Sequence, residues 1–212
     1  MNSAVDMKPA YAGMDAGNGK AGLRGIHHLA IVTEDMRATL DFYVRVLRMP
    51  LVHALTTSAN VTSTHGKGAP PFRAIPHLFL DMGGDSLLAF FEYPKGAVGA
   101  SERDRIGAMQ HVSFACGKKR FYETLERVKA AGVPIVGGPV LVIEPAIHSF
   151  YFFDPVNGTR LEVVADFDGD EHDLRLVRSV DQSEAVLRAE LAKISDDPAW
   201  IDEMIAARSR GE

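Results

Sequence analysis

The hydrophobic and polar positions of the chain follow the same succession twice. The first copy opens with an apolar stretch, residues 25–33, that predicts a strand. Residues 33–48 then show the apolar spacing of a helix, which Thr33 or Asp35 can cap and which Met49-Pro50 ends. Three further strands are predicted over residues 51–57, 77–82 and 86–93, with a Gly-Gly-Asp hairpin turn between the last two.

The second copy repeats this order. Residues 108–115 predict a strand, and residues 118–131 predict a helix that stops at Gly132, with Pro134 just beyond. Strands follow over residues 140–143, 149–154 and 160–165, and Asn157-Gly158 forms the turn before the last strand. The pattern predicts an α+β protein with two tandem βαβββ modules, residues 24–98 and 106–166.

Neither end of the chain belongs to the repeat. Residues 1–23 are rich in Gly and Ala and predict a flexible N-terminal arm rather than a targeting signal. Residues 167–212 contain two helical patterns, 183–194 and 197–209, and predict a helical C-terminal extension. This extension packs on the domain or on a second subunit, or else it is a solvated tail.

Composition narrows the classes of function. The 212 residues carry a net charge of only -5 with both signs scattered, which gives no clustered basic surface for nucleic acid. No apolar run is long enough to cross a membrane. A lone Cys116 excludes an internal disulfide and fits a reducing compartment. We therefore expect a cytoplasmic protein with no nucleic-acid or membrane partner.

Candidate chemistry comes from comparing the two copies. Adjacent residues of a strand face opposite sides, so His27 and His28 point in opposite directions. The counterpart of His27 is Gln110, whereas the counterpart of His28 is His111. Histidines at matched positions of a repeat favour metal ligands. The alternative is a pair of half-buried strand histidines satisfied by hydrogen bonds.

The last strand of the second copy adds a carboxylate. Glu162 stands inside the apolar run 161-LEVV-164, and burying its charge is costly unless it is paired or binds a metal. The first copy has Ala89 at the matching position, and the next acid, Glu92, lies on the opposite face. Two imidazoles and one carboxylate suit Fe(II) or Mn(II) with open coordination positions. We predict that the two copies bring His28, His111 and Glu162 together as a metal site.

These residues resemble the vicinal oxygen chelate superfamily, which includes glyoxalase I, extradiol ring-cleaving dioxygenases, and fosfomycin- and bleomycin-resistance proteins. The resemblance is carried by 28-HLAIV-32, 40-LDFY-43, 111-HVSF-114 and 150-FYFFDPVNGTRLE-162. It covers residues 24–166 and neither end of the chain. It implies sheets that curve around a metal held by strand-one histidines and last-strand acids.

The pattern of site residues is most similar to that of the extradiol dioxygenases, which use two histidines and one glutamate. These enzymes carry a Tyr just before an acid-Pro pair, as Tyr151 does here, and a catalytic histidine ahead of it, for which His148 is the candidate. The His148 spacing is shorter than in that family, and the turn glycine is displaced by one place. The resemblance implies Fe(II), or else Mn, Ni, Zn or Co, with a catechol-like aromatic diol and O2 as substrates.

In that chemistry His148 accepts and returns a catechol proton, and Tyr151 hydrogen-bonds a metal-bound hydroxyl and stabilises the intermediate. An aromatic substrate also needs an apolar wall, and His77, Phe79 and Phe90 are the predicted substrate-binding residues. Ordinary core packing is the alternative for each of them. We further expect a homo-oligomer, because domains of this kind often pair.

Two other functions stay open. A glyoxalase- or epimerase-like lyase or isomerase uses Ni, Zn, Co or Mn and needs a fourth ligand or a base, for which Glu92 is the candidate. A small-molecule-sequestering resistance protein binds its ligand without turnover.

Overall fold

The computed structural model describes residues 25–59, 72–96, 99–100, 102–169 and 180–207. The chain divides into two compact units, Gly25–Leu174 and a second one that contains the C-terminal helices. The predicted N-terminal arm, residues 1–23, lies outside the described residues. The first unit holds both predicted modules.

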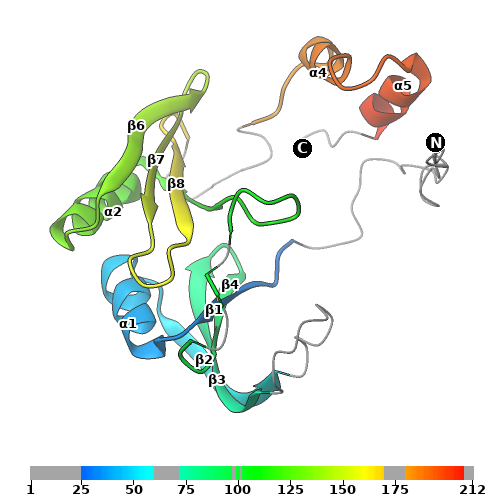
Figure 1. Cartoon of the computed structure of the whole chain (residues 1–212). Helices are drawn as coiled ribbons and strands as arrows, with labels where there is room; N and C mark the ends of the chain where they lie inside the picture. The colour runs from blue at the N-terminus through cyan, green and yellow to red at the C-terminus, as the bar shows by residue number, and fades with distance from the viewer. Residues whose placement is uncertain (1–24, 60–71, 97–98, 101, 170–179, 208–212) are drawn as a thin grey trace, which may run out of the picture. The chain divides into compact units, whose positions relative to one another are not determined.

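The first module is a four-stranded mixed sheet with a helical segment on one face (Figure 1). Its strands are β1 (His28–Thr33), β2 (Leu51–Ala59), β3 (Phe72–Gly83) and β4 (Ser86–Glu92), in the spatial order β1-β4-β3-β2. Strand β1 runs parallel to β4, and the other two pairs are antiparallel. All four strands were predicted, although β2 and β3 are longer than the pattern indicates.

The predicted helix of this module is divided into α-helix α1 (Met36–Leu40) and π-helix η2 (Asp41–Val46). Asp35 caps α1, since its side chain accepts a hydrogen bond of 2.9 Å from the backbone N–H of Ala38. The wider π-helical turn buries two adjacent residues, Phe42 and Tyr43. Regular helical spacing does not predict that neighbours share one buried face.

The second module has the same topology, which confirms the predicted repeat. Its strands are β5 (Val112–Gly117), β6 (Ile135–Ile143), β7 (Ile147–Phe153) and β8 (Arg160–Asp166), in the order β5-β8-β7-β6, and its helix is α2 (Lys118–Ala130). The predicted start of the first strand, residue 108, is wrong. The backbone N–H of Ala108 instead closes a turn onto the Arg105 carbonyl at 2.9 Å, so His111 immediately precedes the strand.

The two modules share a hydrophobic core on the helix-facing sides of their sheets. The rings of Phe42 and Phe152 lie 6.4 Å apart across this junction. The Tyr43 hydroxyl donates a 3.0 Å hydrogen bond to the Asp154 carboxylate, and both residues are buried. Burial, with the nearby charge of Asp154, raises the pKa of Tyr43 well above its usual value. Tyr43 is therefore a permanent donor at neutral pH.

The described C-terminal residues form α4 (Glu184–Leu191) and α5 (Pro198–Ala206), as the helical patterns predicted. Ser183 and Asp197 cap them, because each side chain accepts backbone N–H groups of the first turn. Arg188 and Asp202 join the two helices through a 2.6 Å contact. The helices thus form a hairpin with its own polar link.

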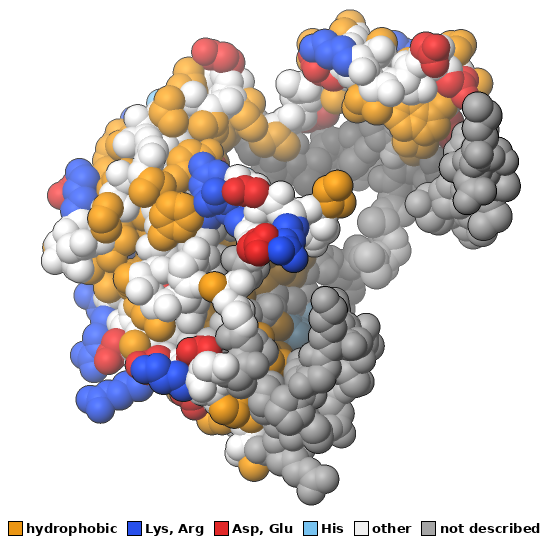
Figure 2. Space-filling model, viewed as in Figure 1, with side chains coloured by type: hydrophobic (Ala, Val, Ile, Leu, Met, Phe, Trp, Pro, Cys, Tyr) orange, Lys and Arg blue, Asp and Glu red, His pale blue; other side chains and the backbone are white. Residues whose placement is uncertain are grey.

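Charged side chains of both signs are interspersed on the face of the molecule that Figure 2 shows. Several form short-range surface pairs within one helix, such as Arg45 with Asp41 at 2.7 Å. Exposed pairs of this kind stabilise a fold only slightly. Within the described ranges, no helix has the length and apolarity that crossing a membrane requires.

Candidate metal centre

The carboxylate of Glu162 is the buried centre of the polar groups on the second sheet. Glu162 lies in β8, where its cross-strand partners are Ser113 on β5 and Tyr151 on β7. Directly paired residues share a face of a sheet, so these side chains gather on one side. Glu162 is 7% exposed, and its Oε2 lies 2.9 Å from His111 Nε2. Two of the three predicted ligands are thus in contact.

The surroundings of Glu162 favour its ionised form. Burial alone raises the pKa of this carboxyl, but the hydroxyls of Ser149, Tyr151 and Ser113 act against burial. The nearby imidazole of His111 also favours the charge, and the net result is a pKa below the usual value. Burial, together with the carboxylate, raises the pKa of Tyr151. The site therefore pairs an anionic Glu162 with a protonated Tyr151 at neutral pH.

His111 is oriented by its sequence neighbour. Its Nδ1 contacts the amide oxygen of Gln110, and an oxygen acceptor requires that Nδ1 carry the proton. The other ring nitrogen, Nε2, is then directed at Glu162. Metal-binding histidines are commonly held in this way, with one nitrogen anchored and the other facing the ion.

His28 lies on the corresponding face of the first sheet. Its ring contacts Phe79, with 5.7 Å between centroids, and its Nδ1 lies 2.9 Å from Nδ1 of His27. The prediction that His27 and His28 point in opposite directions is therefore wrong, because His27 precedes β1 and is not bound by strand alternation. His28 is exposed, as are Ala30 and Val32 on the same face of β1. This face of the first sheet is therefore open along β1.

Strand register confirms the predicted asymmetry of the repeat. Ala30 pairs with Ala89, and Ser113 pairs with Glu162, two residues beyond His28 and His111 respectively. Ala89 therefore occupies the place of Glu162 in the first module and supplies no ligand. Glu92 lies on the opposite face, where its Oε1 accepts a 2.8 Å hydrogen bond from the backbone N–H of Met36. Glu92 thus caps α1 on the face of the sheet opposite Ala89.

The structure does not bring His28 together with His111 and Glu162. Across the described part of the chain, no three His, Cys, Asp or Glu side chains lie close enough to hold one ion. The reason is the way the modules pack, through their helix-facing sides, while the ligands lie on the other faces of the sheets. One chain thus presents two partial ligand sets.

His148 is not where its predicted catalytic role requires it. It lies three residues before Tyr151 on a β7 strand that pairs regularly with β8, so the two side chains face opposite sides. The His148 ring stacks on Phe167 at 3.9 Å, and its Nδ1 donates a 2.8 Å hydrogen bond to the Ala146 carbonyl. His148 therefore has a packing role, and the prediction of acid–base catalysis does not fit its position.

The predicted substrate-binding residues lie on two opposite faces of the first sheet. Phe90 is fully buried on the helix side, with its ring 4.8 Å from that of Tyr43, so it belongs to the core and the prediction for it is wrong. His77 and Phe79 share the face of His28, because they pair with Phe91 and Ala89 respectively. These two keep the location that the prediction requires.

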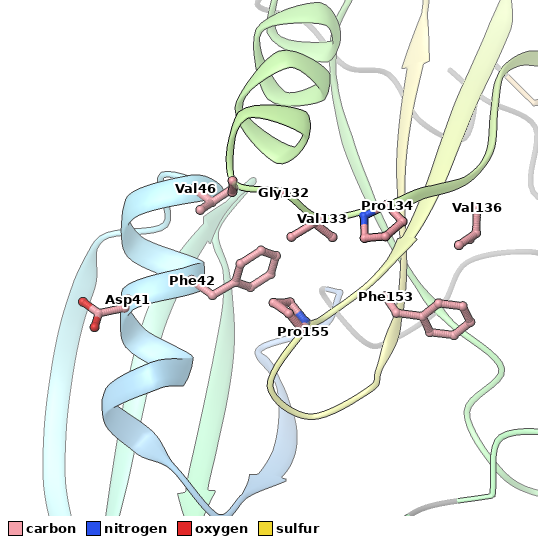
Figure 3. A pocket seen from close by; sticks show the side chains of 10 residues that line it. Asp41, Phe42, Val46, Gly132, Val133, Pro134, Val136, Phe153 and Pro155 are labelled. Atoms are coloured by element: carbon pink, nitrogen blue, oxygen red, sulfur yellow. The ribbon is translucent and has the colours of Figure 1, made fainter.

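A cavity of about 490 Å³ lies elsewhere, between η2 and the segment that follows α2 (Figure 3). Phe42 points toward Val133 and Pro155 within it, while Asp41 points away (Figure 3). Its lining is largely apolar and includes neither His111 nor Glu162. This cavity is part of the module junction and is separate from the candidate metal centre.

Sequence reasoning missed Ser113 and Ser149, which line the Glu162 carboxylate. Strand alternation could have identified both, since each stands two residues from a predicted site residue, His111 or Tyr151. A single serine in a strand does not by itself indicate a site unless it is known to lie beside a carboxylate. Their importance follows only from the strand order, which places β5 and β7 on either side of β8.

Comparison with known proteins places this arrangement in a family. No curated protein matches the chain. Similar solved structures include a glyoxalase/dioxygenase from Nostoc punctiforme, at 22% identity and with a TM-score of 0.49. This match covers 68% of the present chain and 92% of the Nostoc chain. The fosfomycin resistance protein FosX from Listeria monocytogenes matches at 17% identity, TM-score 0.46, and 66% and 90% coverage. The family model of the Glyoxalase/Bleomycin resistance protein/Dioxygenase superfamily matches residues 25–163, and the chain belongs to that superfamily.

Proposed function

We propose that the chain is an extradiol-type dioxygenase that cleaves a catechol-like aromatic diol with O2, with Fe(II) held by His28, His111 and Glu162. The observation that carries the proposal is the asymmetry of the repeat. An ionised Glu162 contacts His111 in one module, and Ala89 stands in its place in the other. Two histidines and one carboxylate leave coordination positions for a bidentate diol and for oxygen.

The donor set fits a divalent cation. Glu162 is a buried carboxylate whose ionised form is favoured in this structure by neighbouring hydroxyls and by His111. A metal ion held by His111 Nε2 and the carboxylate would take the place of their direct contact, and its affinity should fall as the pH is lowered. When bound, iron supplies Lewis acidity and one-electron chemistry toward diol and oxygen. Mn, Ni, Zn and Co are alternatives that metal analysis distinguishes.

The residues around Glu162 have separate tasks in this proposal. Ser113 and Ser149 orient the carboxylate, and Gln110 fixes the ring of His111. Tyr151 stays protonated, and its single hydroxyl proton is directed at Glu162 in this structure. With the carboxylate engaged by a metal, the same proton would be available to a substrate oxygen. This is the role predicted for Tyr151 from the sequence. The predicted proton transfer by His148 is not retained.

The test of the proposed reaction is oxygen consumption. Protein loaded anaerobically with Fe(II) and mixed with a panel of catechols should consume one O2 per diol and form coloured ring-fission products. Diol-independent oxygen uptake, or none, would reject the dioxygenase. Proton exchange on a hemithioacetal or thioester, with bound Ni or Zn, would then support the lyase or isomerase. Tight ligand binding indifferent to chelators would support the sequestering protein.

We also propose that a second copy of the chain completes each metal site, with His28 from one copy and His111 and Glu162 from the other. Two partial ligand sets on one chain, directed away from the module junction, support this arrangement. A two-fold symmetric pair would build two equivalent sites. This is the homo-oligomer expected from the sequence.

Complementation between two inactive variants tests the shared site. His28→Ala and Glu162→Gln are each expected to be inactive alone. Co-expression of the two should restore about a quarter of the wild-type activity, because half of the dimers are mixed and each has one intact site. A site formed within one chain predicts no recovery, since every chain then lacks one ligand. Co-expression of His28→Ala with itself is the control.

A further inference from the structure

His77 is a buried histidine with a free hydrogen-bonding group. It is 8% exposed, and its Nε2 has no hydrogen-bond partner among the described residues. Its ring is held between two phenyl rings, Phe91 at 3.6 Å and Phe79 at 4.3 Å between centroids. The direction of Nε2 is therefore fixed by packing before any ligand binds. An unpaired polar atom at such a position costs stability unless something else completes it.

His77 lies on the metal-binding side of the first sheet. The ring of Phe79 contacts both His77 and His28, so the two histidines are separated by a single phenyl ring. His53, on β2, contacts the same ring at 5.5 Å. Burial lowers the pKa of His77, with smaller effects from His28 and His53. The imidazole is therefore neutral at pH 7 and can donate from one nitrogen. Among the described side chains of this face, the remaining charged group is Asp81, which accepts a hydrogen bond from the backbone N–H of Gly83.

The repeat places a second such group at the equivalent position of the other module. His77 pairs with Phe91, two residues after Ala89, and Ser149 pairs with Val164, two residues after Glu162. Ser149 is the other buried side chain whose polar atom lacks a hydrogen bond of ordinary geometry in the described residues. In the second module the group next to it is Glu162. In the first module the corresponding residue is Ala89, which has no polar side chain to hydrogen-bond with His77.

We propose that His77 determines substrate specificity by hydrogen-bonding, through Nε2, an acceptor oxygen of the substrate that does not chelate the metal. This inference rests on the proposed function for the metal-chelating pair of oxygens. With a cation held at His28, the face of the first sheet that carries His77 would be electropositive, which would favour an anionic substituent over a neutral one. The substrate class is then a catechol that carries a carboxylate, rather than an unsubstituted diol.

The experiment compares the binding of catechol and 3,4-dihydroxybenzoate to metal-loaded protein by calorimetry without oxygen. Wild-type protein should bind the carboxylated diol more tightly. His77→Phe keeps the aromatic stack and removes Nε2. It should weaken binding of 3,4-dihydroxybenzoate about tenfold and change catechol binding by less than about twofold. His53→Phe is the matched control, because it removes an exposed imidazole from the same phenyl ring. It should change neither affinity.

The outcomes separate the two proposals. If wild-type protein prefers the carboxylated diol and His77→Phe removes that preference, the assignment of His77 holds even when no oxygen is consumed. The proposed reaction would then fail alone. Equal binding of both diols by wild-type protein, no binding of either, or equal loss of both in His77→Phe overturns the assignment. Thermal melting of His77→Phe without ligand, close to that of wild type, shows that the comparison concerns folded protein.

Discussion

Replacing Glu162 by Gln is expected to lower the affinity of the protein for Fe(II) by about a hundredfold or more, since even residues that only support a ligand contribute 10–100-fold. The amide keeps the shape of the side chain and can still accept from the surrounding hydroxyls. It lacks the charge that a divalent cation requires. Metal content after dialysis, and calorimetric titration of the metal, measure the loss.

In metal-free protein, the effect of the same substitution on the free energy of unfolding should depend on pH. The pKa of Glu162 is lowered from 4.5 by folding, so its ionised form stabilises the fold above about pH 4.5. That stabilisation disappears as the pH falls through the lowered pKa. The difference in unfolding free energy between wild type and Glu162→Gln should therefore be present at pH 7 and shrink in acid. Urea unfolding at several pH values measures it.

Glu92→Gln is the matched control for metal binding. Glu92 is the acid that lies nearest to Ala89 along the last strand of the first module, but its Oε1 caps α1 through Met36 N. The control should lose some stability and keep the affinity of wild type for Fe(II). Retention of tight metal binding by Glu162→Gln, or its loss in Glu92→Gln, would contradict the ligand assignment.

Replacing Gly138 by Ala is expected to destabilise the protein by roughly 2–5 kcal/mol. Gly138 has φ +79, in the left-handed region, and an added Cβ would lie 2.3 Å from the Ser149 carbonyl oxygen. It would also lie 2.9 Å from the Phe150 Cα, so backbone rather than a mobile side chain must move. The displaced strand is β7, which carries Ser149 and Tyr151. Chemical denaturation measures the effect.

Gly158→Ala separates the two causes. Gly158 has a similar φ of +70, but an added Cβ meets nothing within 4 Å. It should therefore cost only the backbone strain, about 1–2 kcal/mol. Equal destabilisation by the two substitutions would show that the close approach of β6 to β7 at Gly138 is not what requires glycine there.

The architecture could be predicted from the sequence because local patterns indicate the strands, the helix and the turns of each module. Capping by Asp35 and the turn glycines appear in the structure where the pattern predicts them. The differences arise where tertiary contacts override local spacing. The π-helical turn that buries Phe42 beside Tyr43 is one case, because the shared core rather than helical periodicity selects these neighbours.

The site was harder to predict. Comparing the repeats identified the contact between His111 and Glu162 and the replacement by Ala89. His148 was assigned from its closeness to Tyr151 along the chain, although an odd separation in a regular strand already places them on opposite faces. The separation of His28 from the other ligands depends on how the modules pack, and no local pattern encodes that.

The bond between Tyr43 and Asp154 makes each module depend on a buried residue of the other. Asp154 also accepts hydrogen bonds from the backbone of Val156 and Asn157, so its own turn fixes where the carboxylate must lie. If one module were replaced by that of a related protein, the junction would keep this bond only if the new module carried the matching residue, Tyr at position 43 or Asp at position 154. A chimaera assembled from the halves of two such proteins would therefore need both residues to keep the junction between the modules.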